Sequence, residues 1–135
     1  MKLSVLIPAH NEEGSIGETV HGVFEVLTKE KIPHEILVVN DHSTDQTEEV
    51  LNKIAVELPS LRSINSSLPN GFGYAVRCGL SNFNGGCVAL FMADASDSPD
   101  DLVKFYWTLV QGNYDAVFGS RFISGGRTIN YPQIK

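Results

Sequence analysis

Short apolar runs alternate along the chain with longer amphipathic stretches, and this alternation constrains the fold more than any other feature of the sequence. The apolar runs cover residues 3–7, 35–39, 61–64, 87–91 and 115–118. Most are rich in Val, Ile, Leu or Phe and poor in charge, as is typical of strands buried on both faces of a sheet. The sequence therefore predicts five short strands.

The stretches between these runs carry apolar residues at the three- and four-residue spacing of a helix. Ser15 with Glu18 predicts a capping box at the start of the first helix, and Ser43 with Gln46 predicts a similar cap for the second. Both signals place helices directly after the polar loops that follow the strands.

Residues 74–83 predict a weaker third helix, because Gly79 interrupts the pattern. A fourth helix is expected to begin at Pro99, since proline suits the first position of a helix. Strands and helices in strict alternation need right-handed crossover connections. The expected fold is therefore α/β, a doubly wound and mainly parallel sheet with helices on both faces, and residues 1–135 are expected to form a single domain.

In such sheets, ligands bind beyond the carboxyl ends of the strands, so the residues that follow each strand are the candidates for chemistry. Asp41 follows the second strand, where an aspartate can accept hydrogen bonds from a base or ribose, or simply cap a turn. Asp45 fits the capping role. After the third strand, Gly71 would let backbone amides approach a phosphate and Arg77 would add a positive charge. A glycine-rich turn with a solvated arginine explains the same residues.

The fourth strand leads into an acidic stretch, residues 92–101, and this is the most informative segment of the chain. Carboxylates directly after a buried strand are costly to hold without a cation, and Mg²⁺ takes one or two carboxylates together with substrate phosphate oxygens. Asp94 is therefore the predicted metal ligand, and Ser96 or Asp97 could complete the shell. Arg121, after the fifth strand, could neutralise a phosphate at the same edge.

The formal net charge of −6 and the pI near 5.1 argue against nucleic acid as a partner, because its phosphates need a basic surface. Cys78 and Cys87 have no metal or disulfide spacing, which favours reduced thiols and a cytosolic location. The opening apolar run stops at Pro8, so the sequence predicts no signal core and no transmembrane segment.

Together these segments resemble the family-2 glycosyltransferases with the GT-A fold, especially the dolichol-phosphate mannose synthase branch and related polyprenyl-phosphate sugar transferases. Four blocks in the right order carry the resemblance: residues 4–13, residues 38–47, Met92-Ala93-Asp94 with Pro99, and residues 115–121.

The resemblance implies that Pro8, Glu12 and Asp41 line the base and ribose pocket, that Asp94 belongs to an Asp-x-Asp metal motif, and that Arg121 faces a phosphate. The full expected nucleotide-sugar site is Pro8, His10, Glu12, Asp41, Gly71, Arg77, Ala93, Asp94 and Arg121.

The chain departs from the family pattern at several of these positions. Met92 replaces the first aspartate of the metal motif, Asn40 the aspartate before Asp41, and His10 a common tyrosine. Pro69 stands where asparagine is usual, and the family generally carries roughly another hundred residues after such a segment.

The expected function is inverting transfer of a sugar from a UDP- or GDP-sugar to a polyprenyl phosphate or a glycan, assisted by Mg²⁺ or Mn²⁺, with no catalytic base identified. The expected location is the cytoplasm, at the inner face of the membrane.

The alternative function is a catalytically silent nucleotide-sugar-binding domain of a larger assembly, and Met92 favours this alternative. A nicotinamide-dependent oxidoreductase is disfavoured, because no G-x-G-x-x-G follows the first strand. A sugar-nucleotide pyrophosphorylase is disfavoured because the first loop is acidic.

Overall fold

The computed structural model describes residues 1–112. Four strands and four helices alternate there: β1 (Leu3–Ala9), α1 (Ile16–Lys29), β2 (His34–Asn40), α2 (Thr47–Glu57), β3 (Leu61–Asn65), α3 (Phe72–Leu80), β4 (Cys87–Leu90) and α4 (Pro99–Gln111). The fifth expected strand, residues 115–118, lies outside the described residues. The chain divides into two compact units, residues 1–99 and 100–135, and the expectation of a single domain stays a prediction. The fold and the candidate site below belong to the first unit.

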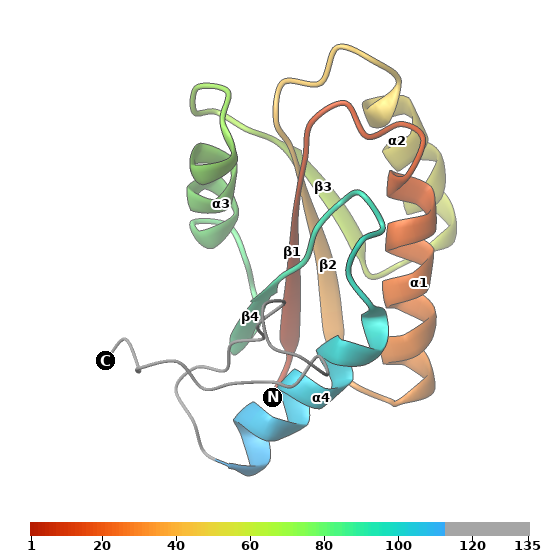
Figure 1. The fold of residues 1–135 in the computed structure, drawn as a ribbon, viewed down its shortest axis with the longest axis vertical. Coiled ribbons are helices and arrows are strands. Elements are labelled where there is room, and N and C mark those ends of the chain that lie inside the picture. Colours follow the sequence, from red (N-terminus) through yellow and green to blue (C-terminus); the bar gives the residue numbers. More distant parts are fainter. Residues whose placement is uncertain (113–135) are drawn as a thin grey trace. The chain divides into compact units, whose positions relative to one another are not determined.

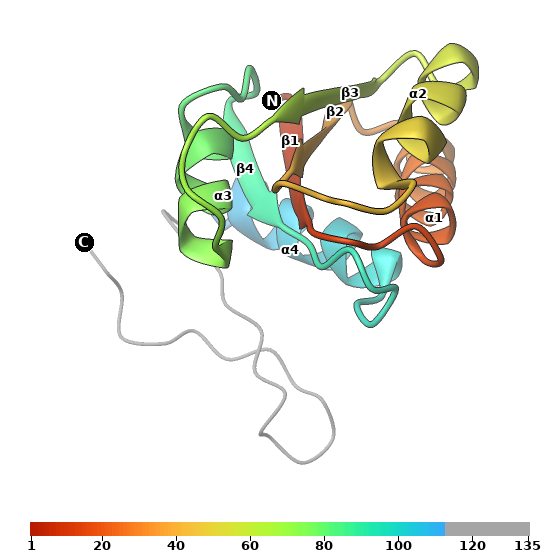
Figure 2. The same cartoon turned by 90° about the horizontal axis from the view of Figure 1, so that it is seen from above.

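The four strands form one sheet in the order β3-β2-β1-β4, and every neighbouring pair is parallel. Helices α1 and α2 cover one face of this sheet, and α3 covers the other (Figures 1 and 2). The structure therefore confirms the predicted α/β architecture with helices on both faces.

The core lies on both sides of the two central strands. Every residue of β1 is buried, and so are six of the seven residues of β2. On the α3 face, Leu6, Leu37 and Val39 pack against Ala75 and Cys78 of the helix. Cys78 is buried, Cys87 is partly buried, and both thiols are free.

Gly79 does not interrupt α3, which runs through it from Phe72 to Leu80. A β-carbon at this position would lie within 2.9 Å of three side-chain atoms of Leu6 in β1. The glycine therefore permits close packing of the helix on the sheet, and its low helix propensity is outweighed by that contact.

Neither predicted capping interaction forms, although Ser15 is the residue before α1 as predicted. Ser15 and Gln46 occupy the N-cap positions of α1 and α2, but neither makes a side-chain capping hydrogen bond. The Ser15 hydroxyl donates instead toward Glu12 Oε2 and the Ala93 carbonyl, at 2.8 and 3.0 Å. Ser43 Oγ accepts from the Asn11 backbone N–H at 3.0 Å. In both cases the serine hydroxyl bonds to a residue distant in the chain and not to the backbone of the helix that it was predicted to cap.

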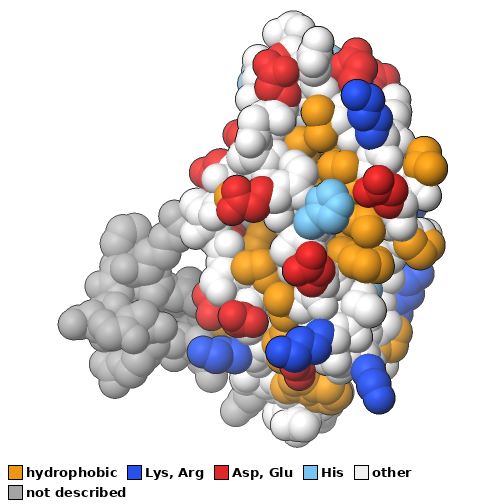
Figure 3. All heavy atoms as spheres, turned by 90° about the vertical axis from the view of Figure 1, so that its right-hand side faces the viewer, with side chains coloured by type: hydrophobic (Ala, Val, Ile, Leu, Met, Phe, Trp, Pro, Cys, Tyr) orange, Lys and Arg blue, Asp and Glu red, His pale blue; other side chains and the backbone are white. Residues whose placement is uncertain are grey.

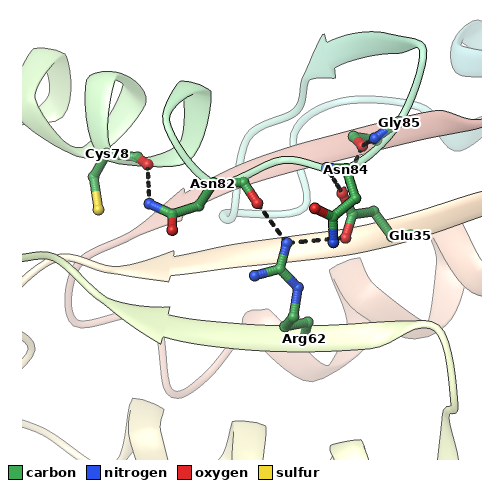
Figure 4. A network of polar contacts seen from close by, with 7 residues as sticks. Glu35, Arg62, Cys78, Asn82, Asn84 and Gly85 are labelled. Carbon is green, nitrogen blue, oxygen red and sulfur yellow. Dashed lines mark hydrogen bonds and ion pairs between the residues drawn. The ribbon is translucent and has the colours of Figure 1, made fainter.

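A polar network with a buried carboxylate at its centre fastens the amino ends of β1, β2 and β3 to the loop between α3 and β4 (Figure 4). Glu35 of β2 is its centre: its carboxylate accepts from Ser4 Oγ at 2.6 Å, from the Asn84 backbone N–H at 2.6 Å and from Arg62 Nη2 at 3.1 Å. Arg62 also donates to the Asn82 carbonyl at 2.6 Å.

The Glu35 network shifts the pKa of its own carboxyl group. Burial by itself would raise the pKa of Glu35, but the hydrogen bonds from Ser4, Asn84 and Arg62 outweigh it and hold the pKa below its usual value of 4.5. Glu35 is therefore a satisfied structural carboxylate.

The outer surface of α1 and α2 shows acidic side chains interspersed with apolar ones, with basic side chains fewer and mainly toward the lower end of that face (Figure 3). Across residues 1–112, no helix combines the length and apolar character needed to cross a bilayer.

Candidate functional site

A pocket of about 230 Å³ opens beyond the carboxyl ends of the strands. The loops after β1, β2 and β4 reach the same end of the sheet, the upper end in Figure 1. The pocket is lined by Pro8, Ala9, His10, Glu12, Asp41, Asn70, Gly71, Phe72, Met92, Ala93 and Asp94. Seven of the nine expected nucleotide-sugar residues lie in this wall: Pro8, His10, Glu12, Asp41, Gly71, Ala93 and Asp94.

Asp41 is the most distinctive of these residues, because it is buried and only half satisfied. Its side chain is 4% exposed. Oδ2 accepts from the Gly71 backbone N–H at 3.0 Å, whereas Oδ1 has no hydrogen-bond partner in the part of the chain that the structure describes. An unpaired buried polar atom costs about 1–3 kcal/mol. Asp41 lines the pocket, so this unpaired oxygen is a candidate acceptor for a hydrogen bond from a ligand.

Gly71 meets Asp41 through its backbone and has a φ of 152°, a conformation that favours glycine. It also occupies the N-cap position of α3. The turn that precedes α3 is thus tied to β2 through a carboxylate, and this contact closes one side of the pocket.

His10 is oriented by a hydrogen bond to the backbone. Its Nδ1 lies 2.6 Å from the carbonyl oxygen of Asp41, and a carbonyl can only accept, so Nδ1 carries a hydrogen. In the neutral ring, Nε2 is then an acceptor, and it lies 3.3 Å from the Asn11 side-chain amide. The imidazole is therefore held as a fixed part of the pocket wall.

A second set of hydrogen bonds holds the β1 loop against the β2 loop. The Asn11 side-chain oxygen accepts from the backbone N–H groups of Thr44 and Asp45, at 2.8 and 3.3 Å. Asn11 adopts a φ of 53°, which asparagine tolerates better than most residues. The Glu12 N–H donates to Thr47 Oγ1 at 2.9 Å.

Asp45 completes this connection and acts as the helix and turn cap that the sequence suggested. Oδ1 accepts from the Thr47 N–H and hydroxyl, and Oδ2 accepts from the Glu13 N–H at 3.2 Å. Desolvation by itself would raise the pKa of Asp45, but the bonds from Thr47 and Glu13 lower it below its ordinary value.

The acidic loop after β4 brings one carboxylate into the pocket. Asp94 lines the wall, and its Oδ1 accepts from the Ser96 N–H at 3.0 Å. Asp97 accepts from the Met92 N–H through Oδ2 at 3.0 Å, and neither Ser96 nor Asp97 lines the pocket. Ala95 has a φ of 63°, a left-handed conformation that costs an alanine about 1–2 kcal/mol.

This donor set suits a cation that arrives with a phosphate ligand. Within residues 1–112, no group of three or more His, Cys, Asp or Glu side chains is arranged to hold a metal. Mg²⁺ commonly binds proteins through one or two carboxylates plus substrate phosphates, and Asp94 with its neighbouring loop fits that pattern.

Two expected residues are not part of the main pocket. Arg77 lies in an adjoining cavity of about 430 Å³ formed with Asn70, Gly71, Gly73 and Tyr74, and its guanidinium is 6.0 Å from the centre of the Tyr74 ring. Arg121 lies outside the described residues. The two cavities share Asn70 and Gly71, so Arg77 extends the site on the α3 side.

Sequence reasoning did not assign a binding role to four residues of the wall: Ala9, Asn70, Phe72 and Met92. Ala9 and Asn70 adjoin predicted residues and could have been found by adjacency. Phe72 is 51% exposed and follows Gly71 directly. An aromatic residue beside a glycine turn was the sequence signal that could have identified it as part of the pocket wall.

The fold and the position of this pocket define a doubly wound α/β protein with a pocket at the carboxyl edge of its sheet. The model of the family described as glycosyl transferase family 2 matches residues 4–135, and the chain belongs to this family.

A dolichol-phosphate mannosyltransferase of Pyrococcus furiosus is 30% identical over 132 residues, which are 98% of this chain and 36% of that protein. The S. aureus TarS 1–349 structure in complex with UDP-GlcNAc has a TM-score of 0.68 and 25% identity, covering 98% of this chain and 37% of that one. A mannosyltransferase of Pyrobaculum calidifontis in complex with GDP-Man and Mn²⁺ has a TM-score of 0.68 and 26% identity, covering 79% of this chain and 32% of that one. The chain spans between 31% and 52% of the length of the first curated relatives it matches.

Proposed function

We propose that this chain binds a UDP- or GDP-sugar and transfers the sugar, with inversion, to an acceptor that is a polyprenyl phosphate or a glycan. The family supports glycosyl transfer, and the mannosyltransferase relative supports a lipid-phosphate acceptor. The proposed place of action is the cytoplasm, at the inner face of a membrane.

The observation that carries the proposal is Asp41, a residue of the pocket wall whose buried Oδ1 has no hydrogen-bond partner within residues 1–112. Uracil and guanine each carry a ring N–H group that can donate a hydrogen bond to a carboxylate oxygen, whereas the corresponding cytosine nitrogen carries no hydrogen. The two structural neighbours named above bind a uridine and a guanosine sugar nucleotide, respectively. Asp41 is therefore proposed to select for a base of this class.

Asp94 is proposed to hold the ligand's diphosphate through Mg²⁺ or Mn²⁺, with Ser96 and Asp97 shaping its loop. When bound, such an ion supplies charge stabilisation to the diphosphate that leaves the sugar. Arg77 and Arg121 are proposed to add positive charge near the ligand. We assign no catalytic base: an anionic lipid phosphate attacks without one, and a sugar hydroxyl needs one.

The decisive experiment is calorimetric titration with UDP, GDP, dTDP and CDP, each with and without Mn²⁺, for the wild-type chain and for Asp41→Asn. UDP or GDP is expected to bind more tightly than CDP in the wild type. Asp41→Asn keeps the size of the side chain but presents an amide, so it is expected to weaken UDP or GDP binding roughly ten- to a hundredfold and to narrow the gap to CDP.

Equal affinity for all four nucleotides, or an Asp41→Asn variant that binds as the wild type does, would contradict the proposed base pocket.

Met92 favours a second candidate, a catalytically silent donor-binding domain, because it supplies no carboxylate to the metal motif. Metal-dependent hydrolysis of UDP- or GDP-sugar separates the two: nucleotide binding without any turnover supports the silent domain.

A further inference from the structure

The carbonyl oxygen of Ala93 accepts hydrogen bonds from two hydroxyl groups near the start of α1. Thr19 Oγ1 donates at 3.1 Å and Ser15 Oγ at 3.0 Å. Ala93 directly precedes Asp94 and is 3% exposed, and Thr19 is 4% exposed. A buried helix side chain is thus bonded to the backbone unit next to the proposed metal ligand.

The two hydroxyls do not contribute equally to this contact. Ser15 Oγ has one hydrogen to donate and two acceptors, because Glu12 Oε2 lies 2.8 Å away and is the nearer one. Thr19 Oγ1 makes no other side-chain hydrogen bond within residues 1–112. The Thr19 hydroxyl therefore donates to the Ala93 carbonyl alone, whereas the Ser15 hydroxyl divides its one hydrogen between two acceptors.

The loop that Thr19 contacts has a conformation that needs outside support. Ala95 lies in the left-handed region, and a strained residue persists when the surrounding contacts determine its conformation. The bonds from Ser96 to Asp94 and from Met92 to Asp97 join residues of the loop to one another. The bonds from Thr19 and Ser15 join the loop to α1 and so fix its place relative to the pocket.

We propose that Thr19 is a positioning residue for the cation site: its hydroxyl, through the Ala93 carbonyl, holds Asp94 in the place from which it meets the ligand-bound cation. This inference rests on the proposed function. Residues that orient a metal ligand without touching the metal typically contribute ten- to a hundredfold to metal affinity. Thr19 therefore affects the metal-dependent part of nucleotide affinity and leaves the metal-free part unchanged.

The test compares Thr19→Val with Thr19→Ser by calorimetry, using UDP and GDP in Mn²⁺ and again in EDTA. Valine keeps the shape of threonine and removes the hydroxyl, whereas serine keeps the hydroxyl. Thr19→Val is expected to lose about tenfold in affinity in Mn²⁺ and nothing in EDTA. Thr19→Ser is expected to retain the wild-type enhancement by Mn²⁺. If valine prevents folding, as judged by circular dichroism, Thr19→Ala takes its place with the same expected result.

A hydroxyl-free variant with the full wild-type enhancement by Mn²⁺ would overturn the inference and leave the proposed function intact. Equal losses in Mn²⁺ and in EDTA would also overturn it, because they indicate a merely structural role. A wild-type chain whose nucleotide affinity does not depend on Mn²⁺ would overturn both this inference and the proposed metal assistance.

Discussion

Two aspartates in the pocket wall, Asp41 and Asp94, differ in their hydrogen bonds and their surroundings. Asp41 is buried, with one oxygen fixed by the Gly71 backbone and the other unpaired. Asp94 sits in a loop that carries a strained alanine and further carboxylates. The sequence could predict that both residues reach the same edge of the sheet, because each directly follows a strand. It could not predict which oxygen is left unpaired, since that depends on a backbone N–H thirty residues away in the chain.

At the residue scale, we expect Asp94→Asn to remove the effect of Mn²⁺ on nucleotide binding, because the amide is a far weaker ligand for a hard cation. Affinity in Mn²⁺ should fall to the value measured in EDTA, as followed by calorimetry. Asp97→Asn tests the neighbouring carboxylate and should keep the Mn²⁺ effect, because its amide oxygen can still accept from the Met92 N–H and the residue does not line the pocket. If Asp97→Asn lost the Mn²⁺ effect and Asp94→Asn kept it, the metal ligand would be Asp97 and not Asp94.

Among the elements, strands were predicted better than the ends of helices. The first strand was predicted over residues 3–7 and runs from Leu3 to Ala9 in the structure, and the second was predicted over residues 35–39 and runs from His34 to Asn40. Strand prediction succeeds here because burial on both faces leaves a continuous apolar run. The caps of α1 and α2 failed because the hydroxyls of Ser15 and Ser43 serve contacts between distant loops, which no local pattern encodes.

Helix α3 offers a matched pair of glycines. At Gly79 an added methyl group would overlap with the buried Leu6 side chain, whereas at Gly73 it would meet nothing within 4 Å. We expect Gly79→Ala to lower the free energy of unfolding by about 1–3 kcal/mol, because overpacking outweighs the better helix propensity of alanine. Gly73→Ala should be neutral or stabilising by up to about 1 kcal/mol. Chemical denaturation of both variants checks this, and a stable Gly79→Ala would show that α3 can move away from β1.

In the first unit, a charged hydrogen-bond network and the pocket lie at opposite ends of the sheet. The Glu35 network joins β1, β2 and β3 to the loop after α3 at the amino ends, and the pocket lies at the carboxyl ends. The sequence alone did not reveal this network. A single glutamate in a strand pattern carries no sign of the arginine and the loop amides that the fold brings to it.

The Glu35 network predicts a pH dependence of stability. The folded state lowers the pKa of Glu35 below 4.5, so it favours the ionised carboxylate more than the unfolded chain does. The resulting stabilisation is present above about pH 4.5 and is lost as the pH falls through the lower pKa of the folded state.

Glu35→Gln should therefore lower the free energy of unfolding by about 2 kcal/mol at neutral pH and make its decline in acid shallower. Urea denaturation from pH 7 to pH 3 measures both effects. Glu48→Gln, at an exposed position of α2, is the control and should change stability by less than about 0.5 kcal/mol. Parallel acid profiles for the wild type and Glu35→Gln would contradict this account.

Strand β2 carries Glu35 near its start and leads directly into Asp41 at its end. Six residue steps of about 3.3 Å each place the two positions roughly 20 Å apart along the strand, more than twice the distance over which physiological salt screens charge. A substitution at Asp41 is therefore expected to leave the hydrogen bonds of Glu35 intact. One continuous strand thus separates the residue that governs stability in acid from the residue proposed to contact the nucleotide base.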